Sequence, residues 1–205
     1  SAASDVYKRQ GLGGPLSDLR VIDMGHVVAG PFAGTLLADL GADVIKVEDP
    51  KTGGAPIRRL SPSPNDAPLW WKVAGRNKRS VAINLREDAG RDLVLDLVEH
   101  ADVLIENFRP GTLERFGLGP DVLAERNPRL VLLRISGFGQ GPLGQGRPGF
   151  GRVGEAMSGA ANLTGNPDGP PMHVGFSLGD ATSGLMGAFG VLAALRSRDE
   201  TGKGD

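Results

Sequence analysis

The chain has 205 residues, a formal net charge of −1 at pH 7 and no cysteine. The near-zero charge gives no electrostatic reason to expect binding to nucleic acid or to an anionic membrane surface. The absence of cysteine excludes disulfides, thiolate catalysis and cysteine-ligated zinc, and it favours a cytoplasmic location. Apolar residues make up 40% of the chain and charged residues 23%, which is typical of a globular domain with one core.

We expect neither a membrane span nor a targeting signal. No apolar run reaches the roughly 18 to 20 residues that cross a bilayer, and the first residues lack the basic-then-apolar order of a signal peptide. Residues 1–14 show no hydrophobic period, so we predict a disordered or foreign leader there. The folded region is then expected to cover residues 15–205.

The beginning of the folded region predicts a βαβ unit. Residues 19–24 and 42–48 are apolar runs typical of strands, and residues 32–40 predict a helix that begins near Pro31 and ends at Gly41. The two strands of such a unit are normally parallel. The loop after the first strand has no Gly-x-Gly-x-x-Gly sequence, which disfavours a nicotinamide-binding site.

The rest of the chain extends this pattern. Three further apolar runs, at residues 81–85, 103–107 and 130–135, predict strands. Because these strands alternate with helical segments, the sequence predicts an α/β, Rossmann-like fold with a parallel sheet and helices on both faces. The expected helical segments are residues 87–100, 113–116, 122–126 and 153–161.

One acid, Asp180, stands just before an uncharged apolar stretch at residues 185–195 that predicts a buried helix. Near a helix N-terminus, the backbone N–H groups and the helix dipole favour a negative charge. Asp180 is therefore either a helix cap or a catalytic carboxylate. The residues around it favour a cap but leave both interpretations open.

Six segments, taken together, carry a family resemblance. In chain order they are LRVIDMGHVVAGPFAGTLLADLGADVIKVE, NKRSVAINL, ADVLIENFRPGTLERFGL, NPRLVLLRISGFGQGP, RPGFGRVGEAMSG and GDATSGLMGAFGVLAAL. Each segment is a weak signal alone, but their order over residues 15–205 resembles the class III CoA-transferases. This is the family of formyl-CoA transferase, carnitine CoA-transferase and α-methylacyl-CoA racemase.

The resemblance implies that Asp180 is a nucleophile. In such enzymes the aspartate at this position attacks an acyl-CoA thioester and forms an acyl-aspartyl anhydride. A carboxylate is a weak nucleophile but a mixed anhydride is a reactive acyl donor, so one difficult exchange becomes several easier steps. The implied function is transfer of CoA from an acyl-CoA to a carboxylic acid, with no tightly bound cofactor and no metal. The run GFGRVGEAMSG resembles the branch that uses succinyl-CoA.

The resemblance also assigns positions that bind CoA or substrate. A planar guanidinium suits phosphate oxygens, which makes arginines the expected phosphate contacts. The assigned positions are His26, Val28 and Ala29 after the first strand, Ile83 and Arg86 after the third, Asn107 and Phe108 after the fourth, and the arginines Arg58 and Arg115.

Several positions depart from the patterns of individual family members. Val28 stands where formyl-CoA transferases carry a glutamine near the acyl group, which disfavours formyl-CoA and oxalate. Asp49 replaces a phosphate-binding arginine, for which Arg58 is the candidate substitute. Phe150 and Gly151 replace the catalytic histidine and the following aspartate of the racemases, so exchange of a proton between two bases lacks a partner.

Family members are longer than this chain. It therefore resembles an N-terminal fragment of the large domain of an interlinked-ring fold, without the small domain and the C-terminal return. We expect an interlinked homodimer for the full-length protein and an inactive isolated fragment. A racemase-like isomerase and a non-catalytic CoA-binding fragment remain alternatives. Glu155 lies either beside the site or simply in a helix, and we do not assign it to catalysis.

Overall fold

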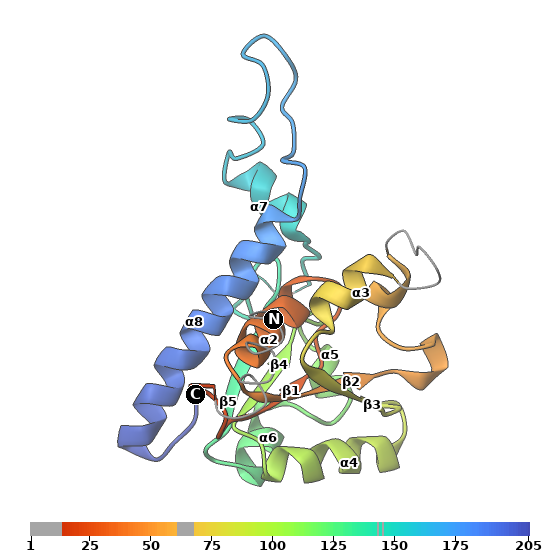
Figure 1. Cartoon of the computed structure of the whole chain (residues 1–205), viewed down its shortest axis with the longest axis vertical. Coiled ribbons are helices and arrows are strands. Elements are labelled where there is room, and N and C mark those ends of the chain that lie inside the picture. Colours follow the sequence, from red (N-terminus) through yellow and green to blue (C-terminus); the bar gives the residue numbers. More distant parts are fainter. Residues whose placement is uncertain (1–13, 61–67, 143, 145) are drawn as a thin grey trace, which may run out of the picture.

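In the computed structural model, which describes residues 14–60, 68–142, 144 and 146–205, a parallel sheet is covered by helices on both faces (Figure 1). The five strands lie in the order β3-β2-β1-β4-β5, and every neighbouring pair is parallel. The predicted Rossmann-like α/β fold is therefore confirmed. The strands are β1 (Arg20–Asp23), β2 (Asp43–Glu48), β3 (Lys78–Ala82), β4 (Val103–Glu106) and β5 (Val131–Arg134).

Helices connect the strands and continue beyond the last one. Most of the predicted helices are present, with ends that differ by a few residues. Of the predicted leader, only Gly14 lies within the described residues, and it packs against Gly41. The helices are α2 (Ala29–Asp39), α3 (Leu69–Ala74), α4 (Asp88–Glu99), α5 (Thr112–Arg115), α6 (Pro120–Arg126), α7 (Gly151–Met157) and α8 (Leu178–Thr201), with short 3₁₀ helices at Pro50–Thr52 and Pro56–Arg59.

Alternate side chains of the strands build a core on each face of the sheet. Val21 and Val103 pack with α2 and α8 on one face. Ile22 and Leu104 pack with α4, α5 and α6 on the other. This alternation is the period of two expected for strands buried on both faces.

The third strand begins earlier than the sequence predicts. It was expected at residues 81–85, but the polar residues from Lys78 onward already pair with β2, starting opposite Val44. An edge strand needs only its main chain to pair, so it requires no apolar run. The side chain of Lys78 is buried nonetheless, because it reaches a carboxylate inside the molecule.

That carboxylate belongs to Asp23, at the centre of a buried charge cluster. The Nζ atoms of Lys46 and Lys78 lie 3.2 and 2.8 Å from its two carboxylate oxygens. Lys78 also donates to the carbonyl oxygen of Pro31 at 2.6 Å, and Lys46 to that of Gly25. Burial alone would raise the pKa of Asp23, but the two ammonium groups outweigh burial and lower it. The cluster thereby fixes the chain between β1 and α2.

Helix α8 is not buried as a whole, and this corrects the prediction. A single stripe, made by Gly184, Ala188, Val191 and Leu195, faces α2 and the sheet. The large apolar side chains on the opposite side are exposed. These are Leu185, Met186, Phe189 and Leu192. The apolar composition of a helix predicts that it is buried, but it does not distinguish a helix covered on one face from a helix covered on all faces.

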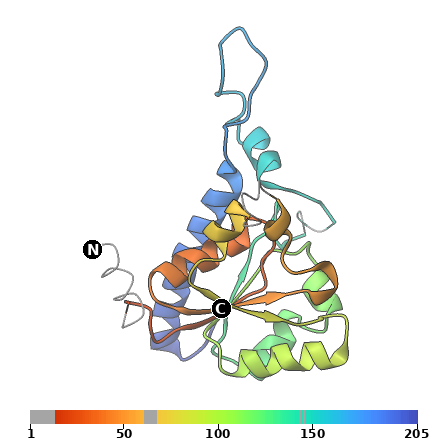
Figure 2. The ribbon, with the colours of Figure 1, turned by 45° about the vertical axis from the view of Figure 1, so that its right-hand side comes forward.

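One of the two interpretations of Asp180 is excluded, and one further expectation about α8 was wrong. Asp180 lies in its first turn, and Ser177 occupies the N-cap position, so Asp180 is not the helix cap. The helix is also long and apolar enough, by length and composition alone, to cross a membrane. The sequence prediction looked for an unbroken apolar run. The mean hydropathy of α8 stays high although Asp180 and several glycine, serine and threonine residues interrupt such a run. Between α7 and α8, residues 158–177 project away from the sheet (Figures 1 and 2).

We predict that Asp23→Asn lowers the free energy of unfolding by about 3 to 5 kcal/mol, because it leaves buried lysines without a counter-charge. Denaturant unfolding at pH 7 measures this. Since the folded-state pKa of Asp23 is lowered, the difference between the two proteins should shrink as the pH falls below the ordinary aspartate value of about 4.

Asp43→Asn is the matched control, because Asp43 pairs with Arg79 on the same sheet at a partly exposed site. It should lower the free energy of unfolding by about 1 kcal/mol or less. Equal losses in the two variants would contradict a special role for the buried cluster.

Candidate functional site

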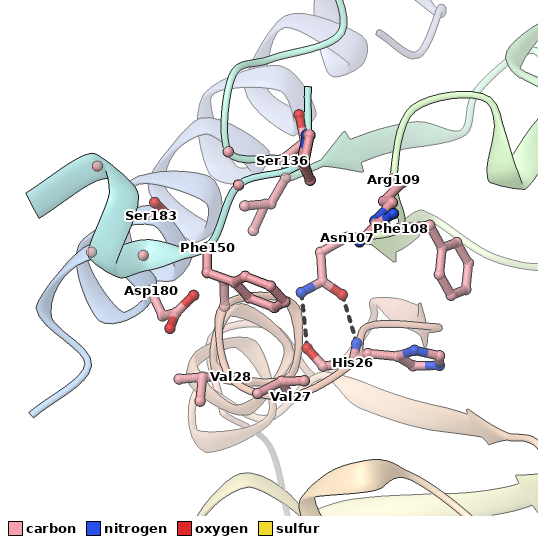
Figure 3. Close-up of a pocket in the computed structure, with 18 of the residues that line it drawn as sticks. His26, Val27, Val28, Asn107, Phe108, Arg109, Ser136, Phe150, Asp180 and Ser183 are labelled. Atoms are coloured by element: carbon pink, nitrogen blue, oxygen red, sulfur yellow. Dashed lines mark hydrogen bonds between the residues drawn. The ribbon is translucent and has the colours of Figure 1, made fainter. Parts of the chain in front are cut away.

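The candidate site is a cleft of about 350 Å³ at the carboxyl ends of the strands. Strand β1 has β2 on one side and β4 on the other. From β2 the chain continues outward to β3, and from β4 it continues outward to β5, in the opposite direction across the sheet. Open parallel sheets bind ligands at such a switch point. The loops after β1, β4 and β5 and the first turn of α8 all contribute to the wall of the cleft (Figure 3).

A reciprocal pair of hydrogen bonds joins two of these loops. The backbone N–H of His26 donates to Oδ1 of Asn107 at 2.6 Å, and Nδ2 of Asn107 donates to the carbonyl oxygen of His26 at 2.8 Å (Figure 3). Val27, the next residue, has a φ of 59°, which is rare for a β-branched side chain. Strain of this kind persists only where the surroundings fix the backbone, and the bonds between His26 and Asn107 do so here.

The imidazole of His26 is uncharged at neutral pH. It packs edge-on against Phe108, with ring centroids 5.0 Å apart. Burial, followed by the nearby charge of Lys46, lowers the pKa of His26 to about 4. His26 can therefore act as a neutral hydrogen-bonding wall, but it brings no positive charge to the cleft.

Asp180 lies on the opposite side of the cleft, where the backbone approaches it closely (Figure 3). A Cβ atom on Gly151 would lie 2.8 Å from the backbone nitrogen of Asp180 and 3.0 Å from its Cγ. A Cβ atom on Gly179 would lie 2.5 Å from the carbonyl oxygen of Gly151. Only glycine fits at these two positions without a shift of backbone. The same contact leaves no room for an aspartate at position 151.

The carboxylate of Asp180 is half-buried, and its surroundings make it more basic. Burial is the first cause of the raised pKa of Asp180, and the negative charge of Glu155 is the second. A more basic carboxylate is a better nucleophile as long as it stays ionised.

Glu155 is a residue that sequence reasoning left unassigned. Its side chain is buried; Oε1 accepts the N–H of Gly179 at 3.1 Å, and Oε2 lies 3.0 Å from Nδ1 of His173. Both partners are distant in the chain, so no local pattern could have found them. The nearest signal was an acid within an otherwise small-residue helix.

Most of the site residues predicted from the sequence meet in this cleft. Six of them line it, from the segment after β1, the loop after β4 and the start of α8. They are His26, Val28, Ala29, Asn107, Phe108 and Asp180. The structure does not test their roles, which stay predictions.

Three more predicted residues line two hollows next to the cleft. His26 and Phe108 form the wall between the cleft and a hollow of about 60 Å³ that also contains Ile83 and Arg86. Arg86 in turn borders an outer hollow of about 440 Å³ that contains Arg115. The hollows thus continue from the wall of the cleft that lies opposite Asp180 toward two arginines. Nη1 of Arg86 is paired with Oδ2 of Asp49 at 2.6 Å.

Arg58 does not line the cleft or these two hollows. Its Nε and Nη2 atoms each lie 2.7 Å from one carboxylate oxygen of Glu48. Its guanidinium also stacks 3.5 Å above the ring of Trp71. One edge and one face of its guanidinium are thus occupied within the protein, and its assignment to CoA phosphate stays a prediction.

Sequence reasoning also missed two cationic side chains in the cleft, Arg109 and Arg147. Arg147 stacks 3.8 Å above the ring of Phe138. Among the residues that the structure describes, no carboxylate pairs with either arginine. Both lie in loops rich in glycine or proline, where an arginine carries no pattern that distinguishes it from a solvated one.

Comparison with known proteins gives a consistent result. The family model for CoA-transferase family III matches residues 16–205. The chain is 48% identical over 191 residues to a succinyl-CoA–D-citramalate CoA-transferase of Chloroflexus aurantiacus, covering 93% of this chain and 47% of that protein. It is 44% identical over 200 residues to a succinyl-CoA:mesaconate CoA-transferase of Haloarcula marismortui, covering 93% of this chain and 50% of that protein.

A solved structure shows the same fold. A CAIB/BAIF family protein from Brucella suis superposes with a TM-score of 0.88 at 38% identity, covering 94% of this chain and 52% of that one. The chain thus spans about half the length of the relatives and of the solved structure that it matches.

We predict that the imidazole of His26 titrates with a pKa of about 4, as its burial and the charge of Lys46 require. Nuclear magnetic resonance of the histidine side chains against pH measures this, and His26→Asn identifies the signal by its loss. Because the folded-state pKa is lowered, His26 should destabilise the fold progressively as the pH falls from about 6.5. A titration of His26 near 6.5 would contradict the described burial.

Proposed function

The chain belongs to CoA-transferase family III, and we propose that the full-length protein containing it moves CoA from an acyl-CoA thioester to a carboxylic acid. One observation carries the proposal. The half-buried carboxylate of Asp180 lines a cleft at the switch point of the sheet, with glycine backbone pressed against it. Such a site offers a nucleophile with a raised pKa and space for a thioester beside it.

The proposed reaction proceeds through covalent intermediates on Asp180. A carboxylate oxygen of Asp180 attacks the thioester carbonyl carbon, the C–S bond breaks, and CoA leaves as a thiolate. The thiolate then attacks the aspartyl carbonyl of the anhydride, which releases the donor acid and leaves an aspartyl-CoA thioester. The acceptor carboxylate repeats these steps in reverse order and departs as the new acyl-CoA, so Asp180 is regenerated.

The adjacent hollows suggest how CoA would lie. The pantetheine arm would pass the wall formed by His26 and Phe108, and the phosphates would reach Arg86 and Arg115. The shared lining of the three hollows supports this path. Arg86 would exchange its pairing with Asp49 for a phosphate, which a bidentate guanidinium accommodates well.

We propose succinyl-CoA as the donor and a small dicarboxylic acid as the acceptor. Two of the relatives named above are succinyl-CoA transferases. Within the described part of the cleft, Arg109 and Arg147 have no carboxylate partner, so either can receive the free carboxylate of a dicarboxylic substrate. Neutral acyl groups would leave this positive charge unused.

The proposal extends to the architecture of the full-length protein. We place residues 15–205 in its large domain and expect the remaining chain to supply the small domain and the C-terminal return. An interlinked homodimer would cover the apolar face of α8, where Phe189 is 66% exposed. Because a partner subunit would then cover the apolar face of α8, we also propose that this helix does not contact a membrane.

The alternatives differ in what they require. The relatives cited above bear the names of CoA-transferases, and they lend a racemase no support. A racemase-like aspartate at position 151 would also need space that Asp180 fills. A non-catalytic CoA-binding fragment needs only the hollows and not Asp180.

The test is chemical trapping. We predict that the full-length protein, incubated with succinyl-CoA and hydroxylamine, gains a hydroxamate on Asp180 that mass spectrometry detects. Asp180→Ala should abolish the label and lower turnover roughly 10³-fold or more, as loss of a covalent nucleophile does.

Asp168→Asn is the matched control, since Asp168 lies exposed in the projecting segment, and it should keep both label and turnover. Retained CoA binding without any label on Asp180 would support the non-catalytic alternative and end the proposal.

A further inference from the structure

We propose that Glu155 is a positioning residue: it holds the first turn of α8 in place and supplies a negative charge beside Asp180. This inference rests on the proposed function, in which Asp180 attacks the thioester. Glu155 itself lies outside the lining of the cleft. It therefore acts on the reaction through Asp180 and not by contact with the substrate.

Glu155 is a buried carboxylate with a polar partner at each of its two oxygens. The residue is 4% exposed, and a carboxylate is rarely buried this far without partners. One oxygen accepts the N–H of Gly179 at 3.1 Å, and the other lies 3.0 Å from Nδ1 of His173. Gly179 directly precedes Asp180, so the hydrogen bond acts one residue from the nucleophile.

Glu155 also links three segments of the chain by hydrogen bonds or close polar contacts. It belongs to α7, Gly179 belongs to α8, and His173 belongs to the returning arm of the projecting segment (Figures 1 and 2). The backbone carbonyl of Glu155 accepts the N–H of Ala161 at 3.2 Å, and Ala161 in turn accepts the N–H of Met172. The base of the projecting segment is thus bound to Glu155, which also accepts a hydrogen bond from the turn that carries Asp180.

The charge of Glu155 opposes the effect of the helix. The N-terminus of α8 stabilises an anion and would make Asp180 a weaker base and a weaker nucleophile. Glu155 takes up one backbone N–H of that turn and adds a negative charge, which raises the pKa of Asp180 after the effect of burial. Strengthening the nucleophile is the expected outcome.

Other ionisable groups face the same region. Arg152 on α7 and His173 on the returning arm both act on Glu155 itself. On the side of the cleft, Arg109 and Arg147 contribute positive charge, whereas His26 is neutral above about pH 4. Helix α2 presents Ala29 and no charged residue to the cleft. Glu155 is the negative group among these that touches the turn of Asp180.

The first experiment compares Glu155→Gln with the unaltered full-length enzyme. Glutamine keeps an oxygen for the N–H of Gly179 but removes the charge. We expect kcat/KM to fall about 10-fold, because a neutral amide holds the N–H of Gly179 less strongly than a carboxylate does, and because Asp180 becomes a weaker nucleophile without the negative charge. The acid limb of the pH profile should move to lower pH, because Asp180 loses its negative neighbour. An unmoved limb would show a merely structural role and overturn the proposal.

Glu125→Gln is the matched control. Glu125 is an exposed acid on α6 and is not part of the cleft lining, so the same substitution there should change neither kcat/KM nor the pH profile.

A second measurement requires no turnover. A carbodiimide labels protonated carboxyl groups, so the pH dependence of labelling at Asp180, read by fragment-ion mass spectrometry without acyl-CoA, gives its pKa directly. In the unaltered protein the midpoint should lie above the ordinary aspartate value, and in Glu155→Gln it should be lower. A midpoint at or below the ordinary value in the unaltered protein overturns the proposal, even if the variant does not fold.

The two proposals can fail separately. A shifted midpoint without a hydroxamate on Asp180 would support the role of Glu155 and end the proposed CoA transfer. A hydroxamate on Asp180 together with an unchanged labelling midpoint in Glu155→Gln would support the proposed CoA transfer and end the role of Glu155.

Discussion

Close backbone contacts between helices fix the position of Asp180, and the rest of the site depends on these contacts. A Cβ atom on Gly184 would lie 2.7 Å from the carbonyl oxygen of Ala29, and one on Gly151 would lie 2.8 Å from the nitrogen of Asp180. Helix α8 therefore presses directly on the first turn of α2 and on the start of α7. Glycine within a helix costs about 1 kcal/mol relative to alanine, and here it brings a carboxylate to the edge of the sheet.

The opposite wall of the cleft depends on buried charge. Lys46 and Lys78 hold Asp23 and also donate to carbonyl oxygens of Gly25 and Pro31. Buried ion pairs add little stability by themselves, but these define the path of the chain from β1 into α2. His26 and Val28 lie on that path, so the sheet interior and the cleft form one connected framework.

Sequence predicted those parts of the structure that local patterns specify. The strands other than β3 are short apolar runs, and their order along the chain fixes a parallel sheet. The edge strand β3 was misplaced because pairing of main chains leaves no apolar pattern in residues such as Lys78. The burial of α8 was overestimated because a helix covered on one side has the same composition as one covered on all sides.

Long-range contacts explain what sequence could not show at the site. Family resemblance brought His26, Asn107 and Asp180 together, and the structure places them in one cleft. Glu155 depends on Gly179, 24 residues away, and Arg58 on Glu48 in a separate element. No local pattern announces that a buried acid will accept a backbone N–H, or that an arginine's binding face is already occupied.

A structure of the full-length protein with bound CoA would test the central claim most directly. The account predicts that the CoA sulfur lies next to the carboxylate of Asp180, with the pantetheine arm passing His26 and Phe108 and the phosphates at Arg86 or Arg115. A CoA molecule whose sulfur lies away from Asp180, with its phosphates on other residues, would contradict it.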